Sequence, residues 1–296
     1  MTEPNMLGFV GVGVMGEKMC RNMAIKAGKP VLAFDQSKEP LQRLSEHGVE
    51  SANSLADVMA RTDMVFLSLP GEPQVRAVVL GEGGLLENAK PGQIIVDCST
   101  CPVALAQEIA EAAKAKGVFF LDAPVSRGTK AAENGTLNFM VGGDQASFDA
   151  AKPYIETMGV DIILCGGPGA GQAVKLMNNM IVVQTVRAIA EALKVAQESG
   201  AVDGKVLFET LTTGSADSFV LRNHGLNSML PGTHPAKTFP VKYIKKDLGY
   251  ALELAESCGV VMTGAETTMD LLNKAEAMEF GDRYYTIIID ALEKRG

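Results

Sequence analysis

The chain has 296 residues, of which 47% are hydrophobic, so it is long enough to bury one large core or two smaller ones. Thirty-five Asp and Glu against 27 Lys and Arg give a formal net charge of −8, which argues against a nucleic-acid partner. No apolar run reaches membrane length, and the first residues do not resemble a signal peptide. With five cysteines and no secretory signal, we expect a cytoplasmic protein with reduced thiols.

The first 35 residues follow the pattern of a dinucleotide-binding unit. A short apolar run at 6–10 leads into a G-x-G-x-x-G turn, and a helical stretch and a second apolar run follow. The first two glycines of such a turn let the backbone approach a pyrophosphate, and the third allows close packing of helix on strand. Backbone N–H groups at the helix start face the phosphates. We therefore assign to the cofactor the turn residues Gly11, Gly13, Val14, Met15 and Gly16.

Asp35 ends the second apolar run, nineteen residues after Gly16. A carboxylate at this place is expected to accept hydrogen bonds from the adenosine ribose. It would repel a 2′-phosphate, so the sequence favours NAD over NADP as the cofactor.

Short apolar runs and helical stretches continue to alternate after this unit. Near-continuous apolar runs are typical of strands that are buried in a parallel sheet. The pattern predicts an α/β fold with a doubly wound sheet, in which ligands bind past the carboxyl ends of the strands. The further strands are expected at 63–69, 93–96, 118–121, 136–141 and 161–164, with helices such as 103–116 and 146–158 between them.

A long helix is predicted next, because no helix breaker occurs from 172 to 199. Its length would be about 40 Å, and its apolar middle predicts neighbours on several sides. Lys175 and Asn179 stand one turn apart and share a face. After about residue 203 the spacing is helical, with loops near 212–218 and 230–239. We predict domains at 1–165 and 200–296, with the helix 166–199 between them.

Four motifs occur in a familiar order: GFVGVGVMGEKMCRNM at 8–23, DAPVSRG at 122–128, GAGQAVKLMNN at 169–179 and KDL at 246–248. With these motifs the chain resembles the β-hydroxyacid dehydrogenase family, the group of 3-hydroxyisobutyrate dehydrogenase and tartronate semialdehyde reductase. The resemblance implies a Rossmann domain, a linking helix and an all-helical domain like that of 6-phosphogluconate dehydrogenase. It also implies assembly into homodimers or homotetramers.

The resemblance implies residue roles as well. Lys175 is similar to the family's catalytic lysine, and Asn179 to its partner at the substrate. The substrate would be a small anionic hydroxyacid or semialdehyde, contacted by Ser126, Arg127, Gly128, Thr100 and Lys246. The cofactor site would include, besides the turn and Asp35, the residues Leu69, Pro70, Thr100 and Lys246.

The expected chemistry gives an independent reason for a lysine. Oxidation of an alcohol sends a hydride to the nicotinamide, while the hydroxyl proton leaves to a base. The three histidines, His47, His224 and His234, are not suitably placed along the chain. A lysine that the long helix's surroundings partly desolvate is expected to have a lowered pKa, so it can exchange that proton near neutrality.

Some features leave alternatives open. Arg127 stands where the family usually has glycine, and it is either a guanidinium fork for an anionic head group, such as a sulfonate, or a surface arginine. Cys98 and Cys101 form a C-x-x-C without a second pair, so we favour structural thiols over a redox or zinc site and expect no metal. Two alternatives on the same fold stay open. Lys175 argues against an imine reductase, and the pair of Lys175 and Asn179, together with the acidic charge balance and the lack of a basic tail, argues against a non-enzymatic relative.

Overall fold

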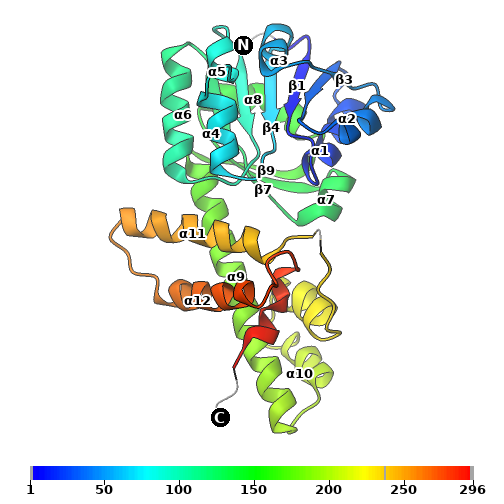
Figure 1. Cartoon of the computed structure of the whole chain (residues 1–296), viewed down its shortest axis with the longest axis vertical. Helices are drawn as coiled ribbons and strands as arrows, with labels where there is room; N and C mark the ends of the chain where they lie inside the picture. Colours follow the sequence, from blue (N-terminus) through cyan, green and yellow to red (C-terminus); the bar gives the residue numbers. More distant parts are fainter. Residues whose placement is uncertain (1–2, 237, 294–296) are drawn as a thin grey trace. The chain divides into compact units, whose positions relative to one another are not determined.

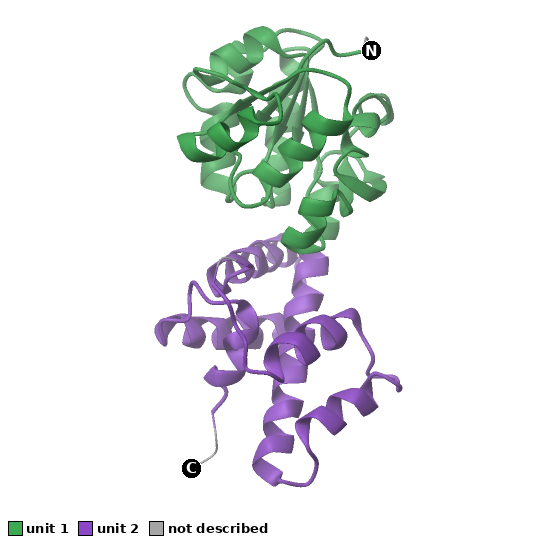
Figure 2. Ribbon diagram, turned by 90° about the vertical axis from the view of Figure 1, so that its right-hand side faces the viewer, with its two compact units in different colours: residues 1–175 green, residues 176–296 purple. Residues whose placement is uncertain are grey.

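The computed structural model describes residues 3–236 and 238–293 and contains two compact units, Met1–Lys175 and Leu176–Gly296 (Figure 2). The boundary between the units falls inside the long helix α9 (Ala170–Ser199). The sequence pattern placed this whole helix between two domains. By its internal contacts, α9 up to Lys175 groups instead with the sheet of unit 1.

Unit 1 is built on one nine-stranded sheet within the described residues (Figure 1). Five neighbouring strands are parallel and run in the order β2-β1-β4-β5-β6, with the short β3 at one edge, as expected for a doubly wound fold. Beyond β6 the direction reverses, because β8 pairs antiparallel with β6 and β7, whereas β9 is parallel to β8. The strands are β1 (Leu7–Val10), β2 (Val31–Phe34), β3 (Glu50–Ser51), β4 (Met64–Leu67), β5 (Ile94–Asp97), β6 (Phe119–Asp122), β7 (Val125–Ser126), β8 (Leu137–Gly142) and β9 (Gly159–Gly166).

Successive residues of the central strands enter different hydrophobic clusters. Phe9 and Phe66 belong to one cluster, while their neighbours Val10 and Val65 belong to the other, as the two-residue period of a strand requires. Both faces are therefore covered by helices. The first cluster is completed by α1 (Gly16–Lys26), α2 (Lys38–Ser45), α7 (Gly128–Asn134) and α8 (Gln145–Ile155), and the second by α3 (Leu55–Arg61), α4 (Glu72–Leu80), α5 (Leu85–Asn88) and α6 (Val103–Ala115).

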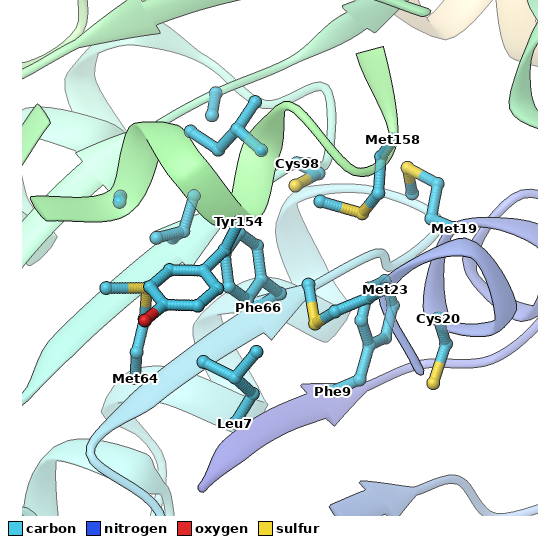
Figure 3. Close-up of a cluster of buried hydrophobic side chains, with 14 of the residues drawn as sticks. Leu7, Phe9, Met19, Cys20, Met23, Met64, Phe66, Cys98, Tyr154 and Met158 are labelled. Carbon is cyan, nitrogen blue, oxygen red and sulfur yellow. The ribbon is translucent and has the colours of Figure 1, made fainter. Parts of the chain in front are cut away.

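The first cluster is rich in sulfur and aromatic side chains (Figure 3). Phe9 and Phe66, on adjacent strands, stack with ring centroids 6.3 Å apart and an interplanar angle of 12°. Met19 and Met23, one turn apart on α1, are fully buried in the same cluster. Methionine adapts to irregular gaps, so several of the fifteen methionines serve as core filler, and α1 is held firmly on the sheet.

Unit 2 is helical over its described residues, as the spacing after residue 203 predicts. The C-terminal part of α9 and five further helices enclose one core, in which Val183, Leu193 and Leu248 are fully buried. None of the described helices is both long and apolar enough to cross a membrane. The further elements are α10 (Gly204–Leu211), the π-helix η1 (Leu221–Met229), α11 (Val241–Ser257), α12 (Thr263–Ala277) and the 3₁₀-helix η2 (Tyr285–Ala291).

His224 lies in an aromatic cluster within this unit. Tyr284 Oη is 2.6 Å from His224 Nδ1, and the rings of Tyr285 and Phe219 pack edge-on against the imidazole. Burial lowers the pKa of His224 to about 4 and raises that of Tyr284 to about 12. A neutral imidazole can accept a hydrogen bond from the tyrosine O–H, and burial disfavours the charged form of His224.

We predict from this cluster a pH-dependent stability. The pKa of His224 in the folded chain is below the unfolded value of about 6.5, so its stabilising contribution is complete above that pH and is lost as the pH falls toward 4. The free energy of unfolding can change through this group by at most about 1.4 kcal/mol per pH unit. When the free energy of unfolding is measured with urea between pH 7.5 and 4.5, it should fall less steeply with falling pH in His224→Asn than in the parent. Asn227→Ala, at an exposed position of the same helix, should keep the parent's slope; equal slopes for the parent and His224→Asn would contradict the prediction.

The third glycine of the G-x-G-x-x-G turn is required by packing. A Cβ on Gly16 would lie 1.9 Å from the carbonyl oxygen of Gly11, a contact that neither backbone can relieve. A Cβ on Gly13 would meet no atom of the chain within 4 Å. The second glycine therefore leaves open space beside the turn, as a bound pyrophosphate needs.

The two glycines give a matched pair of variants. Gly16→Ala should lower the melting temperature strongly, because the turn and α1 can no longer pack. Gly13→Ala should keep the parent's melting temperature but weaken NADH binding, because only a ligand would meet the new methyl group. Thermal unfolding and NADH fluorescence titration of both variants check this. If Gly13→Ala binds NADH as the parent does, the open space at Gly13 does not hold the dinucleotide.

Candidate active site

The glycine-rich turn and Asp35, which the sequence assigns to the dinucleotide, lie together at the carboxyl ends of β1 and β2. Asp35 Oδ2 accepts the N–H of Val12 at 2.7 Å, and Oδ1 accepts the N–H of Ser37 at 2.8 Å. The carboxylate thus holds the glycine-rich turn against the end of β2. A carboxylate has about four acceptor positions, so Asp35 retains capacity for ribose hydroxyls. Val14 is 57% exposed at the same turn, and α1 directs its N-terminus there.

The loops after β4 and β5 are tied to each other. Ser99 Oγ accepts the N–H of Leu69 at 2.9 Å, and Asp97 Oδ1 accepts the N–H of Ser99 at the same distance. Leu69, Pro70 and Thr100, all predicted at the cofactor, therefore lie in neighbouring loops. Because β1, β4 and β5 are adjacent and parallel, these loops and the glycine-rich turn share one edge of the sheet.

A buried carboxylate fixes the first turn of α9 at this edge. Asp122, the last residue of β6, is fully buried, and its Oδ1 and Oδ2 accept the N–H groups of Gly169 and Gln172 at 2.7 and 2.8 Å. N–H groups at a helix start have no partner inside the helix, and a negative charge there is favourable. Burial raises the pKa of Asp122, although the two N–H groups act in the opposite direction.

Lys175 and Asn179 follow on α9, and both are buried, with 8% and 5% of their surface exposed. The amide of Asn179 is held on both sides: Nδ2 donates to Asp247 Oδ2 at 2.6 Å, and Oδ1 accepts from Asn178 Nδ2 at 3.0 Å. One N–H and one lone pair of Asn179 remain for a ligand.

Lys246, the other predicted site residue of unit 2, lies beside the same aspartate as Asn179. Its Nζ lies 3.0 Å from Asp247 Oδ1 and 5.0 Å from the ring centroid of Tyr250. The contact with Asp247 has the distance of a hydrogen bond without its angular geometry, so it is an ion pair. Unit 2 thus brings Asn179 and Lys246 onto one buried carboxylate.

Ser126, Arg127 and Gly128 form the junction of β7 and α7 in unit 1. Arg127 has a φ of +88°, a left-handed conformation that suits the glycine usual in the family. Its Nη2 pairs with Asp161 Oδ2 at 2.5 Å, and its Nη1 donates to the carbonyl of Thr136 at 3.3 Å. The guanidinium is thus held by β9 rather than directed freely into solution.

The thiols of the C-x-x-C are buried and unlinked. Cys98 and Cys101 belong to different hydrophobic clusters, and burial raises the pKa of Cys98 well above its ordinary range. A protonated thiol is a poor nucleophile and metal ligand. In the part of the chain that the structure describes, no three His, Cys, Asp or Glu side chains are grouped closely enough to hold a metal ion.

Three residues that organise these groups have no predicted role: Asp122, Gln172 and Asp247. All three stand within motifs already quoted, and Gln172 also stands three residues before Lys175, on the same helix face. Their positions in these motifs were the features of the sequence that could have indicated a role. Their partners lie 47 to 73 residues away in sequence, so only the folded chain identifies them.

Comparison with known proteins identifies the family of the chain. Residues 6–167 match the model of the NAD binding domain of 6-phosphogluconate dehydrogenase. Residues 169–292 match the model described as NAD-binding of NADP-dependent 3-hydroxyisobutyrate dehydrogenase. Together the two models account for nearly the whole chain.

Individual relatives also match over nearly their full length. A probable mitochondrial 3-hydroxyisobutyrate dehydrogenase of Dictyostelium discoideum is 36% identical over 97% of this chain and 91% of its own. The 2-hydroxy-3-oxopropionate reductase of Escherichia coli is 34% identical over 97% of both. The structure of Mycobacterium tuberculosis 3-hydroxyisobutyrate dehydrogenase with L-serine superposes with a TM-score of 0.88 at 31% identity, covering 98% of this chain and 99% of that one. The chain therefore belongs to the β-hydroxyacid dehydrogenase family of NAD(P)-binding oxidoreductases.

Proposed function

We propose that the protein interconverts a small β-hydroxyacid and its semialdehyde or keto form, with NAD as the cofactor and Lys175 as the general acid and base. The observation that carries the proposal is the burial of Lys175 one turn from the anchored start of α9. Lysine is rarely buried without a specific reason. Relatives named for 3-hydroxyisobutyrate and 2-hydroxy-3-oxopropionate support this substrate class.

The residues would divide the reaction as follows. NAD, which the glycine-rich turn and Asp35 would hold, would supply the acceptor for the hydride of the carbinol carbon. The Lys175 amine takes the hydroxyl proton, so that the carbon–oxygen single bond becomes a carbonyl, and it returns the proton in the reverse direction. The remaining N–H of Asn179 donates to the same oxygen and holds it in line. Ser126, Gly128, Thr100 and Lys246 bind the acid group and the cofactor.

NAD is proposed over NADP because Asp35 directly follows β2, where a carboxylate is expected to face the adenosine ribose of a bound dinucleotide. The 2′-phosphate of NADP would lie close to this charge and would be repelled. Steady-state kinetics with both cofactors test the preference; a larger kcat/KM with NADP would overturn it. Homodimer or homotetramer assembly and a cytoplasmic location are further proposals, and they rest on the sequence alone.

We predict that Lys175→Ala leaves NADH binding near normal but lowers kcat about 10²- to 10⁴-fold, the usual contribution of a general acid or base. Lys175→Arg keeps the positive charge but cannot release a proton near neutrality, so it should be almost equally impaired. Assays with a panel of hydroxyacids and a fluorescence titration with NADH measure both effects. A loss below about threefold in Lys175→Ala, or near-normal turnover in Lys175→Arg, would remove proton transfer from Lys175.

We further propose that Arg127 binds the anionic head group of the substrate in exchange for Asp161. The side chains of this pair are 42% and 52% exposed, and such surface pairs contribute little, at most about 1 kcal/mol, so a substrate anion can replace Asp161. Arg127→Gly should raise KM more than it lowers kcat, with kcat/KM falling roughly ten- to a hundredfold, as expected for loss of a charge-assisted hydrogen bond. Its melting temperature should not fall, since glycine adopts the left-handed φ without strain.

Asp161→Asn is the matched control for this proposal. Asp161→Asn removes the carboxylate that competes for the Arg127 guanidinium. KM should therefore fall if Arg127 binds the anionic head group of the substrate. If Arg127→Gly and Asp161→Asn both keep the parent's kinetics on every acid, Arg127 is a surface residue and the head-group proposal fails.

A further inference from the structure

Gln172 is a fully buried side chain in the first turn of α9, and the proposed reaction gives it no role. Its Oε1 accepts the N–H of Cys101 at 3.0 Å, and its Nε2 donates to the carbonyl of Ser99 at 2.8 Å. These two backbone groups flank Thr100 on either side. One side-chain amide therefore clamps the peptide that carries Thr100.

The clamp connects two parts of the proposed site within unit 1. Lys175 follows Gln172 by three residues, so the two side chains share a face of α9, with about 5–6 Å between their Cβ atoms. Asp122 fixes the same turn through the N–H of Gln172, and Ser99 is fixed in addition through Leu69 and Asp97. The Ser99–Cys101 backbone and the first turn of α9 thus form one rigid assembly.

We propose that Gln172 is a positioning residue, which holds Thr100 at a set place relative to Lys175 while touching neither substrate nor cofactor. The inference rests on the proposed function, because it concerns the distance between Lys175, the proposed general acid and base, and Thr100, which is proposed to lie beside the substrate. A small displacement between reacting groups lowers turnover strongly even when binding is kept. Gln172 should therefore affect kcat far more than cofactor affinity.

Unit 1 offers a matched control in Gln93. This glutamine is also buried, and its amide also bonds only to backbone: Nε2 donates to the carbonyls of Met59 and Thr62, and Oε1 accepts the N–H of Lys90. Its partners lie at the amino end of β5 and beside α3, outside the proposed site. Gln93→Met and Gln172→Met each remove a buried amide of the same size and kind.

The experiment compares the two methionine variants with the parent, using the hydroxyacid that the parent turns over fastest. We expect both variants to lose thermal stability, because buried backbone groups lose their partners. Gln172→Met should lower kcat ten- to a hundredfold with the NADH Kd within about twofold of the parent, whereas Gln93→Met should keep kcat. A kcat of Gln172→Met within threefold of the parent, or an equal loss in Gln93→Met, would overturn the proposal.

Gln172→Glu gives a second readout that a purely structural role would not produce. A protonated glutamic acid can restore the clamp, since its O–H can donate to the Ser99 carbonyl and its C=O can accept from Cys101. An ionised one cannot donate and would face the carbonyl with a negative charge. Burial should raise the pKa of the new acid, so the ratio of its kcat to the parent's should rise as the pH falls from 8.5 to 6. A constant ratio would count against the clamp.

Hydrogen exchange separates this inference from the proposed function. In Gln172→Met the peptide covering residues 97–104 should exchange its amide hydrogens faster than in the parent, and in Gln93→Met it should not. If the parent oxidises no hydroxyacid at all, the proposed function fails and exchange still decides whether the clamp exists. Unchanged exchange at 97–104 in Gln172→Met would reject the clamp, whatever the activity.

Discussion

The carboxylate of Asp122 is the constraint on which the proposed site depends. A helix that begins at the buried edge of a sheet needs partners for its first N–H groups, and Asp122 supplies two oxygens for Gly169 and Gln172. Glycine at 171 lets the helix approach closely, since a Cβ there would lie 2.2 Å from the Met140 carbonyl. The start of α9 thereby becomes part of unit 1, and the position of Lys175 is set by the contacts of this helix start with the sheet.

Side chains fix the ligand-binding loops by bonding to their backbone. Asp35 holds the glycine-rich turn, Ser99 holds the loop after β4, and Gln172 holds the loop after β5. Irregular loops lack the hydrogen bonds of helices and strands, so buried N–H and C=O groups there need other partners. A polar side chain that supplies them also stiffens the loop. Each of the three loops at the edge of the sheet is thus tied to a side chain by hydrogen bonds.

In unit 2 a buried carboxylate, that of Asp247, fixes two other side chains. Asp247 is 2% exposed, accepts a hydrogen bond from Asn179 and pairs with Lys246. A buried carboxylate is costly without such partners, and each partner is in turn held in one orientation. Asn179 and Lys246, which come from α9 and α11, are thus ordered by one residue that the resemblance left without a role.

The sequence alone determined the α/β alternation, the dinucleotide turn, the long helix and the helical character of unit 2, because each is a periodicity or a motif contained in one short stretch. It also located Lys175 and Asn179 on one helix face. Only the folded chain decided the partners: Gln172 reaches 71 to 73 residues back, Asn179 reaches 68 residues forward, and Arg127 pairs with Asp161, 34 residues on. The direction of β8 and β9, opposite to that of the other strands, was likewise decided by the folded chain. The strand β7, with which β8 pairs, has two residues, too few for any periodicity. Local pattern fixes which face of an element is buried, whereas the atoms that meet there are fixed by how distant elements pack.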